Sequence, residues 1–352
     1  MRVALVSSDV LPTPPPRYGG LEQVVWLLAR ELAAMGHEVT LYALRGSRCP
    51  DGAELVELAA GEDVARRHGE RLLHADIVHD HGWQRVAWSL CRDHPGLRAV
   101  WTLHGPHVGY APPPPGLTVC GVSRYHAWSI GAELGRPCPY VYNGVDLDAY
   151  PLWEGPREGY LAWMARIAPE KGLHLALAWA EEAGMPLRVA GTEHLVADAG
   201  YVQAMLRRMD GRRAAWLGDL DHARKVQFLQ RARALLAPTP QFLEAFGLYL
   251  VEAMACGTPV VAMPAPSAPV ELVREGGVVI HHPDGFPAAL EAAMAIPPAD
   301  CRRNAERFGA RAMADAYVAL YERVLGTSQA SREGSTCRGR SPSTAHAQSL
   351  NG

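Results

Sequence analysis

The stretch EAFGLYLVEAMACGTPV, residues 244–260, carries two carboxylates, Glu244 and Glu252, that stand eight positions apart. Gly247 is predicted to open a short helix that Gly257 closes, and the backbone N–H groups at such a start are free to hold an anion. Glu252 falls inside this otherwise apolar helix, where a carboxylate needs hydrogen-bond donors, and sugar hydroxyls are good donors. A structural buried carboxylate would leave the same pattern.

Two cations follow another predicted strand, at residues 160–164. Arg166 and Lys171 lie in the loop after it. This pair suits a diphosphate, because a guanidinium can grip two phosphate oxygens and an ammonium adds a point charge. A solvated surface pair is the alternative interpretation.

A third candidate is the loop Arg17-Tyr18-Gly19-Gly20, which comes just before a helical pattern. Gly19 and Gly20 would let a ligand approach the backbone closely, and the free N–H groups at the helix start favour an anion. A tight turn is the other interpretation. The dinucleotide fingerprint Gly-x-Gly-x-x-Gly is absent from this loop, which argues against a nicotinamide cofactor.

Strands and helices that could position these residues alternate along the chain. Apolar side chains from Leu21 to Met35 recur every three or four residues, which predicts a helix that Gly36 ends. Short apolar runs predict buried strands, and strands separated by helices form parallel sheets. The predicted strands cover residues 3–6, 39–43, 77–79, 99–103, 118–122 and 141–142, and then 160–164, 187–190, 215–217, 234–237 and 259–262.

The pattern restarts after the polar stretch at residues 151–159, so we expect an α/β protein with two Rossmann-like domains. Ligands bind at the carboxyl ends of parallel strands, and two facing sheets would place these ends around one cleft. The tail is rich in Ser, Thr, Gly and Arg and cannot build a core. The predicted parts are residues 1–150, residues 151–300, a C-terminal helix over 301–326 that packs back on the first domain, and a disordered tail over 327–352.

Composition disfavours several classes of protein. The 352 residues carry a formal net charge of −3, which argues against bulk nucleic-acid binding. No apolar run is long enough for a transmembrane helix, and the chain opens on a strand-like run rather than a signal peptide. The seven scattered cysteines form no Cys-x-x-Cys pair, so we expect a reduced, cytoplasmic setting and no zinc site. Short basic clusters, such as Arg207-Arg208, leave peripheral contact with the inner face of a membrane open.

Two acidic motifs look like metal ligands. Asp219-Leu220-Asp221 has the Asp-x-Asp spacing that holds a metal in some enzymes, and His79-Asp80-His81 places three possible metal ligands in a row. Neighbouring residues on a strand point to opposite faces, so the second motif cannot easily converge on one ion. We expect no bound metal. Asp80, His81 and Asp9 are instead candidates for the acceptor side of the cleft.

The sequence resembles the family 4 retaining glycosyltransferases, also called group 1 glycosyl transferases, which have the two-domain GT-B fold. The resemblance covers residues 1–325. It rests on markers that occur in the family's order: Tyr18-Gly19-Gly20, Val78-His79-Asp80-His81, Thr102-Leu103-His104-Gly105, Val122-Ser123, Asn143-Gly144-Val145-Asp146, Arg166 with Lys171, and Glu244 with Glu252 before Cys256-Gly257-Thr258-Pro259-Val260.

The resemblance implies a role for each matching position. The first domain would face the acceptor, and the second would bind a nucleotide-sugar donor. The residues at the reacting sugar and diphosphate would be His104, Arg166, Lys171 and Glu244. Those that bind the rest of the donor would be Gly19, Gly20, Phe246, Gly247, Leu248 and Glu252, the last of these on the ribose. Ala245 departs from the family, where a proline is frequent after the first glutamate.

The implied reaction is transfer of the sugar with retention of configuration, without a metal or any other cofactor. UDP- and GDP-linked donors both fit, and the acceptor could be lipid-linked, a polysaccharide or a small molecule. Two alternatives stay open: a nucleotide-sugar epimerase or hydrolase of the same architecture, and a non-catalytic sugar-nucleotide-binding subunit.

Overall fold

The computed structural model describes residues 1–105, 112–193, 198–239, 244–264 and 268–336, with the last ten described by their backbone alone. Its first sheet has six parallel strands in the order β3-β2-β1-β4-β5-β6. These strands are β1 (Arg2–Val6), β2 (Glu38–Leu44), β3 (Ala53–Leu58), β4 (Ile77–Asp80), β5 (Ala99–Thr102) and β6 (Leu117–Cys120).

The second sheet repeats this arrangement. Its six parallel strands follow the order β12-β11-β10-β7-β8-β9, which is the order of the first sheet read from the opposite edge. The strands are β7 (Leu161–Met164), β8 (Leu187–Ala190), β9 (Ala214–Trp216), β10 (Ala234–Ala237), β11 (Val260–Ala262) and β12 (Gly277–Val279). The prediction of two α/β units with parallel sheets is confirmed.

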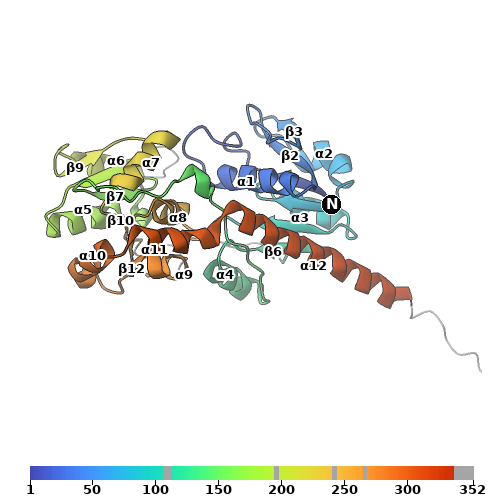
Figure 1. Cartoon of the computed structure of the whole chain (residues 1–352). Helices are drawn as coiled ribbons and strands as arrows, with labels where there is room; N and C mark the ends of the chain where they lie inside the picture. Colours follow the sequence, from blue (N-terminus) through green and yellow to red (C-terminus); the bar gives the residue numbers. More distant parts are fainter. Residues whose placement is uncertain (106–111, 194–197, 240–243, 265–267, 337–352) are drawn as a thin grey trace, which may run out of the picture.

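Helices connect the strands and cover both sheets (Figure 1). The predicted first helix is α1, where the recurring apolar residues are buried and Gly36 follows the end with a positive φ. In the first half the helices are α1 (Gly20–Ala34), α2 (Val64–Leu72), α3 (Val86–Asp93) and α4 (Arg124–Leu134). In the second half they are α5 (Leu173–Glu182), α6 (Ala199–Arg207), α7 (His222–Arg231), α8 (Leu248–Ala255), α9 (Pro269–Val273) and α10 (Phe286–Met294).

Three short segments differ from the prediction. The predicted strand at residues 141–142 is wrong: a single backbone bridge joins Gly121 and Tyr140, and the chain then leaves the sheet edge. Strands β3 and β12 are absent from the prediction; each lies at an edge of its sheet, and between them only Leu58 is fully buried. An edge strand buries little, so its apolar signal is weak.

The C-terminal helices return to the first domain. After α11 (Pro298–Ala305), helix α12 (Ala310–Thr336) runs beside α1 (Figure 1). Apolar residues of α12, among them Met313, Tyr317 and Tyr321, are buried in the same cluster as α1 and β1. The predicted tail boundary at 327 needs correction, because the helical backbone continues to Thr336. Residues 337–352 lie outside the described part of the chain.

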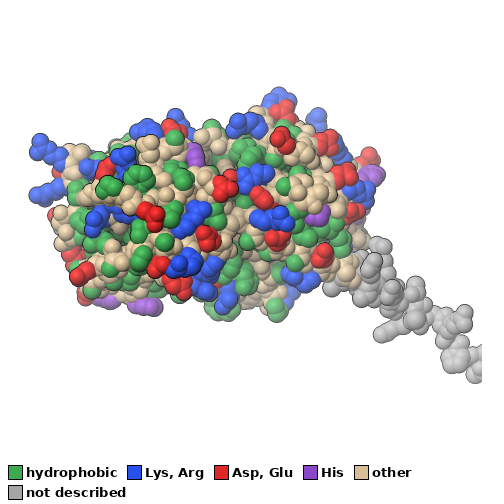
Figure 2. All heavy atoms as spheres, in the orientation of Figure 1, with side chains coloured by type: hydrophobic (Ala, Val, Ile, Leu, Met, Phe, Trp, Pro, Cys, Tyr) green, Lys and Arg blue, Asp and Glu red, His purple; other side chains and the backbone are tan. Residues whose placement is uncertain are grey.

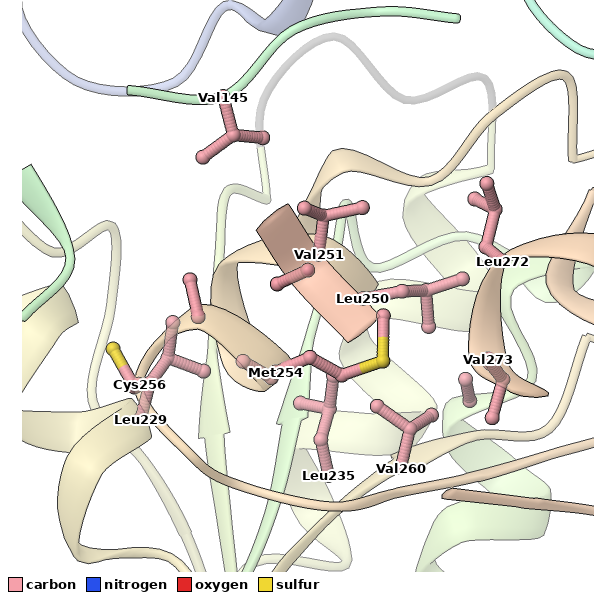
Figure 3. Close-up of a cluster of buried hydrophobic side chains, with 14 of the residues drawn as sticks. Val145, Leu229, Leu235, Leu250, Val251, Met254, Cys256, Val260, Leu272 and Val273 are labelled. Carbon is pink, nitrogen blue, oxygen red and sulfur yellow. The ribbon is translucent and has the colours of Figure 1, made fainter. Parts of the chain in front are cut away.

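One buried cluster holds α8 in place. Leu250, Val251 and Met254 of this helix lie among Leu235 of β10 and Val260 of β11 (Figure 3). All three α8 residues are fully buried. The start of α8 is therefore fixed relative to the carboxyl ends of the second sheet.

On the face shown in Figure 2, basic and acidic side chains are interspersed, in keeping with the small net charge. Among the helices in the described ranges, none is long and apolar enough to cross a membrane.

Candidate active site

A cavity of about 890 Å³ lies between the two domains. In each sheet the strand order reverses at one point, between β1 and β4 and between β7 and β10. Loops that leave neighbouring strands in opposite directions open a crevice at such a point. The loops after β1, β7 and β10 supply much of the cavity wall: Val10, Leu11, Pro15 to Gly19, Ala165, Arg166, Lys171 and Glu244 to Gly247.

The loop from Glu244 to Gly247 leads directly into α8. Gly247 has φ 89°, a left-handed conformation that favours glycine, and it caps the helix. Phe246 anchors the loop by packing against Tyr142 and Phe308. The free N–H groups at the start of α8 belong to residues that line the cavity, as an anion site requires.

Lys171 reaches Glu244 from the loop after β7. Its Nζ lies 2.6 Å from Glu244 Oε2, and both side chains are about one-tenth exposed. Gly172, next to Lys171, packs so closely on the carbonyl of Pro238 that a Cβ would collide with it. The two loops are thus held together by backbone contact, which places a lysine and a carboxylate side by side in the cavity.

Glu252 is engaged by two side chains that the sequence did not indicate. Lys225 Nζ lies 2.8 Å from Glu252 Oε1, and the Tyr150 hydroxyl donates to the same oxygen at 2.6 Å. The lysine also lies 5.0 Å from the centre of the Tyr150 ring. Burial, and then the neighbouring Glu252 charge, raises the pKa of Tyr150, so this hydroxyl stays a donor.

The two lysines in these pairs are the only lysines of the chain. The other 32 of its 34 basic residues are arginines (34 − 2 = 32). Both lysines stand in one cavity, each beside one of the two glutamates. A lysine is a compact point charge with rotatable donors, whereas an arginine carries a larger planar guanidinium, so the two residues are not interchangeable.

Arg166 also lines the cavity, and its Nη2 lies 3.5 Å from Glu170 Oε1. Across the cavity it faces Tyr18 of the first domain. Burial raises the pKa of Tyr18, and the Arg166 charge opposes that rise. The predicted cation pair therefore lies in the cavity and not on a solvated surface.

The first domain brings Gly19 and Gly20 to the same cavity. Leu248, at the start of α8, packs against the buried cluster of the first domain, so the two predicted loops meet across the interdomain boundary. Sequence reasoning missed Glu22 in the first turn of α1, which is buried and accepts a hydrogen bond from Ser8 Oγ. Burial raises the pKa of Glu22. Its position, two residues past the glycines, was the available signal.

His104 lines the cavity at the end of β5. Its Nε2 lies 2.9 Å from His81 Nδ1. Burial, with a smaller contribution from the nearby His126, lowers the pKa of His104 to about 3, so the ring is neutral at physiological pH.

The three acceptor-side candidates are not among the residues that line this cavity. Asp80 is fully buried and accepts hydrogen bonds from the backbone N–H groups of Gly82 and Ala87, so it holds the start of α3. Its assignment to the acceptor side is corrected, because strand alternation turns it away from the cavity. His81 is 2% exposed and lies behind His104. Asp9 accepts from Gln84 Nε2 at 2.8 Å, beside a separate small hollow.

Exposed apolar side chains occupy the first-domain side of the cavity instead. Val10, Tyr18 and Trp83 all line it, and Trp83 is 48% exposed. Exposed aromatic surface in a concave site is typical of ligand contact. A lone tryptophan in a loop carries no periodic signal, so nothing in the sequence indicated a role for Trp83.

The Asp-x-Asp motif at residues 219–221 has a structural role in the helix that follows it. Asp221 accepts from the backbone N–H of Arg224 and caps α7, while Asp219 alone of the two lines the cavity. Within the described ranges, no group of three or more His, Cys, Asp or Glu side chains could hold a metal ion.

Comparison with known proteins matches this architecture. The model of Glycosyltransferase Family 4 matches residues 18–149, and that of Glycosyl transferases group 1 matches residues 154–310. One model thus falls on each sheet. The fold and cavity define a two-domain protein of the GT-B type. The chain belongs to the family 4 glycosyltransferases.

Curated relatives include D-inositol 3-phosphate glycosyltransferases. The protein from Mycobacterium marinum is 32% identical over 226 residues, which are 54% of this chain and 46% of the relative. That from Mycobacterium tuberculosis strain F11 is 31% identical over 229 residues, 58% of this chain and 47% of the relative. The matches thus span about half the length of these relatives.

Solved structures share the fold over nearly the whole chain. A glycosyltransferase involved in avilamycin A biosynthesis superposes with a TM-score of 0.74 at 27% identity, over 93% of this chain and 98% of the other. Sucrose-phosphate synthase from Thermosynechococcus elongatus gives a TM-score of 0.71 at 18% identity, over 93% and 100%.

Proposed function

We propose that the protein transfers a hexosyl group from a nucleoside diphosphate sugar to an acceptor hydroxyl. The observation that carries this proposal is the placement of its only two lysines, each paired with one glutamate of the predicted motif in a single cavity. Two separated charge pairs suit a ligand with a diphosphate and sugar hydroxyls at one end and a ribose at the other. UDP- and GDP-linked donors both fit this arrangement.

The protein's main task in such a reaction is to stabilise negative charge that develops on the leaving diphosphate. Lys171, Arg166 and the free N–H groups at the start of α8 surround the place where that group would lie. When Lys171 turns from Glu244 to a phosphate oxygen, the carboxylate becomes free to accept from sugar hydroxyls. These groups supply the charge without a resident metal or other cofactor.

Retention of configuration is part of the proposal. The bond between the anomeric carbon and the diphosphate oxygen breaks, and the acceptor hydroxyl attacks from the same face. Its proton passes to the departing phosphate oxygen, so the acceptor gains the glycosyl group and the nucleoside diphosphate leaves. Family membership supports this route, and both domains must close around the substrates for it.

The acceptor would enter from the first-domain side, where Val10, Tyr18 and Trp83 line the cavity. A small polyol phosphate, the substrate class in the names of the mycobacterial relatives, is one candidate. Lipid-linked and polysaccharide acceptors are others, and a lipid-linked acceptor would place the cytoplasmic protein at the inner face of a membrane.

The first test incubates the purified protein with UDP-, GDP- and ADP-sugars, with and without EDTA, and follows release of nucleoside diphosphate. EDTA-insensitive release from one donor, lost in Lys171→Ala and Glu244→Ala, is the expected result. Steady release of nucleotide and free sugar that no acceptor redirects would favour a hydrolase, and conversion of the donor to an isomer would favour an epimerase. Binding of a donor without turnover would leave a non-catalytic subunit.

Selective isotope labelling of lysine gives a second test that needs no turnover. The chain has two lysines, so the labelled side chains yield two NMR signals, assigned by Lys225→Arg. A nucleoside should shift the Lys225 signal alone, and a nucleoside diphosphate sugar should shift both. If no nucleotide shifts either signal, the donor site is wrongly placed.

A further inference from the structure

Three histidines form a row that starts behind the cavity and ends inside it. His79 and His81 come from the end of β4, and His104 follows β5. The ring centres are 4.0 Å apart between His79 and His81 and 5.2 Å apart between His81 and His104. His104 lines the cavity, whereas His79 and His81 are no more than 2% exposed.

The inner end of the row is anchored on α12. His79 Nδ1 lies 2.6 Å from the Tyr321 hydroxyl, and its Nε2 lies 2.8 Å from Thr102 Oγ1. The Tyr317 hydroxyl lies 3.0 Å from the same threonine oxygen. Both ring nitrogens of His79 are thus satisfied, and its ring provides a fixed surface on which His81 packs.

The bond between His81 and His104 can form with either ring as the donor. Two neutral imidazoles share one proton along it, between His81 Nδ1 and His104 Nε2. Burial lowers the pKa of both rings, which keeps them neutral. The choice of donor decides which nitrogen of His104 carries hydrogen.

The surroundings of the second ring nitrogen of His81, Nε2, indicate which of the two rings is the donor. His81 Nε2 is buried and has no hydrogen-bond partner among the described residues. If His104 donated, the His81 proton would sit on this nitrogen as an orphaned N–H, and buried N–H groups are very rarely left unpaired. If His81 donates from Nδ1, the orphan is only a lone pair. The proton of His104 then resides on Nδ1, the nitrogen that this bond does not use.

We propose that His81 is a positioning residue that holds His104 as the neutral Nδ1–H tautomer, so that His104 offers a hydrogen-bond donor to the ligand in the cavity. This proposal rests on the proposed function, which puts a sugar and a leaving diphosphate next to His104. A neutral donor suits an oxygen that gains charge during bond cleavage, and its orientation is fixed before the substrate arrives.

The tautomer is measured directly on the ligand-free full-length protein. Nitrogen-15 labelled histidine gives distinct shifts for protonated and unprotonated ring nitrogens, and comparison with His104→Gln assigns the His104 signals. We expect a protonated Nδ1 and an unprotonated Nε2 in His104. The reverse assignment, or a mixture of both tautomers, would overturn the proposal even if the enzyme transfers sugar as proposed.

Variants then test whether the tautomer matters to the reaction. Asparagine can place an amide donor near the position of Nδ1, whereas leucine cannot donate. With UDP-glucose as the probe, followed by the UDP- and GDP-sugar panel, we expect His81→Leu to lower kcat about tenfold, the order of one neutral hydrogen bond, with little change in KM. His81→Asn should recover most of the rate and the Nδ1–H signal.

A double variant separates positioning from a general structural role. In the His104→Ala background, His81→Leu should cause no further loss of kcat, because its effect runs through the ring that has been removed. Additive losses, or a wild-type kcat in folded His81→Leu, would overturn the proposal. If leucine prevents folding, His81→Asn and the tautomer spectrum still decide it. If no donor is consumed at all, the proposed function fails while the spectrum still reports on His81.

Discussion

The two halves of the cavity are built from different chemistry. The second domain presents two close ion pairs, Lys171 with Glu244 and Lys225 with Glu252, on loops fixed by backbone contact and by α8. The first domain presents neutral histidine and exposed apolar surface at His104 and Trp83. The second-domain half is therefore organised by electrostatics, which under the proposed function would hold the charged diphosphate of the donor, and the other half by shape and neutral hydrogen bonds.

The largest effect should come from the charge pair nearest the reacting centre. Lys171→Ala removes a cation from the leaving diphosphate, and we expect kcat/KM to fall by about 10²–10³-fold. Steady-state nucleotide release measures it. Lys171→Arg should lose nearly as much, because the larger planar guanidinium cannot place a compact charge where Lys171 Nζ lies beside Glu244.

The matched control for that arginine variant is Arg188→Lys, an exchange at a half-buried residue of β8 that is not among the residues lining the cavity. It should leave the rate unchanged. A Lys171→Arg enzyme with wild-type activity would show that the second-domain half needs only positive charge, and the contrast between the two halves would weaken.

The outer charge pair should act on binding rather than on chemistry. Among the described residues, Lys225→Ala leaves Glu252 with the Tyr150 hydroxyl as its remaining side-chain donor. We expect the Kd for free UDP or GDP to rise about tenfold, the scale of one charge-assisted hydrogen bond. Calorimetric titration measures it. A fall in kcat at saturating donor, with Kd unchanged, would contradict the assignment of this pair to the nucleotide end.

Substitutions in the apolar, first-domain half of the cavity should change the KM for the acceptor and leave donor binding unchanged. Trp83→Ala removes an exposed ring from the first-domain wall, and we expect the acceptor KM to rise about fivefold while donor hydrolysis stays constant. Trp128→Ala is the matched control, since Trp128 is 64% exposed and lies outside the cavity lining. If Trp83→Ala and Trp128→Ala change the acceptor KM equally, Trp83 has no specific role in acceptor binding.

The smallest expected effect concerns the pH dependence of stability, which tests whether His104 in the first-domain half is neutral. The pKa of His104 lies near 3 in the folded protein, below its ordinary 6.5, so the unfolded chain binds a proton that the folded chain does not. This contribution to stability is present above pH 6.5 and is lost as the pH falls from about 6.5 toward 3. The Tm of wild type should therefore drop more between pH 7 and 5.5 than that of His104→Gln, by about 2 °C.

Exposed His282 provides the control for this comparison. His282→Gln should keep the pH dependence of the wild type. Asp80, whose pKa burial raises to about 7, works in the opposite direction over part of this range, but it is common to all three proteins and cancels. Parallel curves for wild type and His104→Gln would show that His104 is not held neutral.

Local sequence patterns were enough to predict the repeated α/β architecture and to single out the motif that contains Glu244 and Glu252. Strand and helix signals predicted most elements, because buried strands and amphipathic helices imprint their period on the sequence. Edge strands β3 and β12 were missed and the bridge near Tyr140 was misassigned, since these segments bury few side chains and carry a weak apolar signal. Helix α12 continues past its predicted end at residue 326, where the sequence has no periodic apolar residues to signal a helix.

The sequence by itself determined that Glu244, Arg166 and Lys171 follow strands of a parallel α/β fold, at the strand ends where ligands bind, and that Glu252 lies in the helix after Glu244. Only the tertiary structure decided which groups meet. In the folded protein Lys225 pairs with Glu252, Asp80 accepts hydrogen bonds from the backbone at the start of α3, and His81 lies behind His104. Backbone period fixes which face a side chain takes, whereas contacts between residues tens of positions apart depend on how whole elements pack.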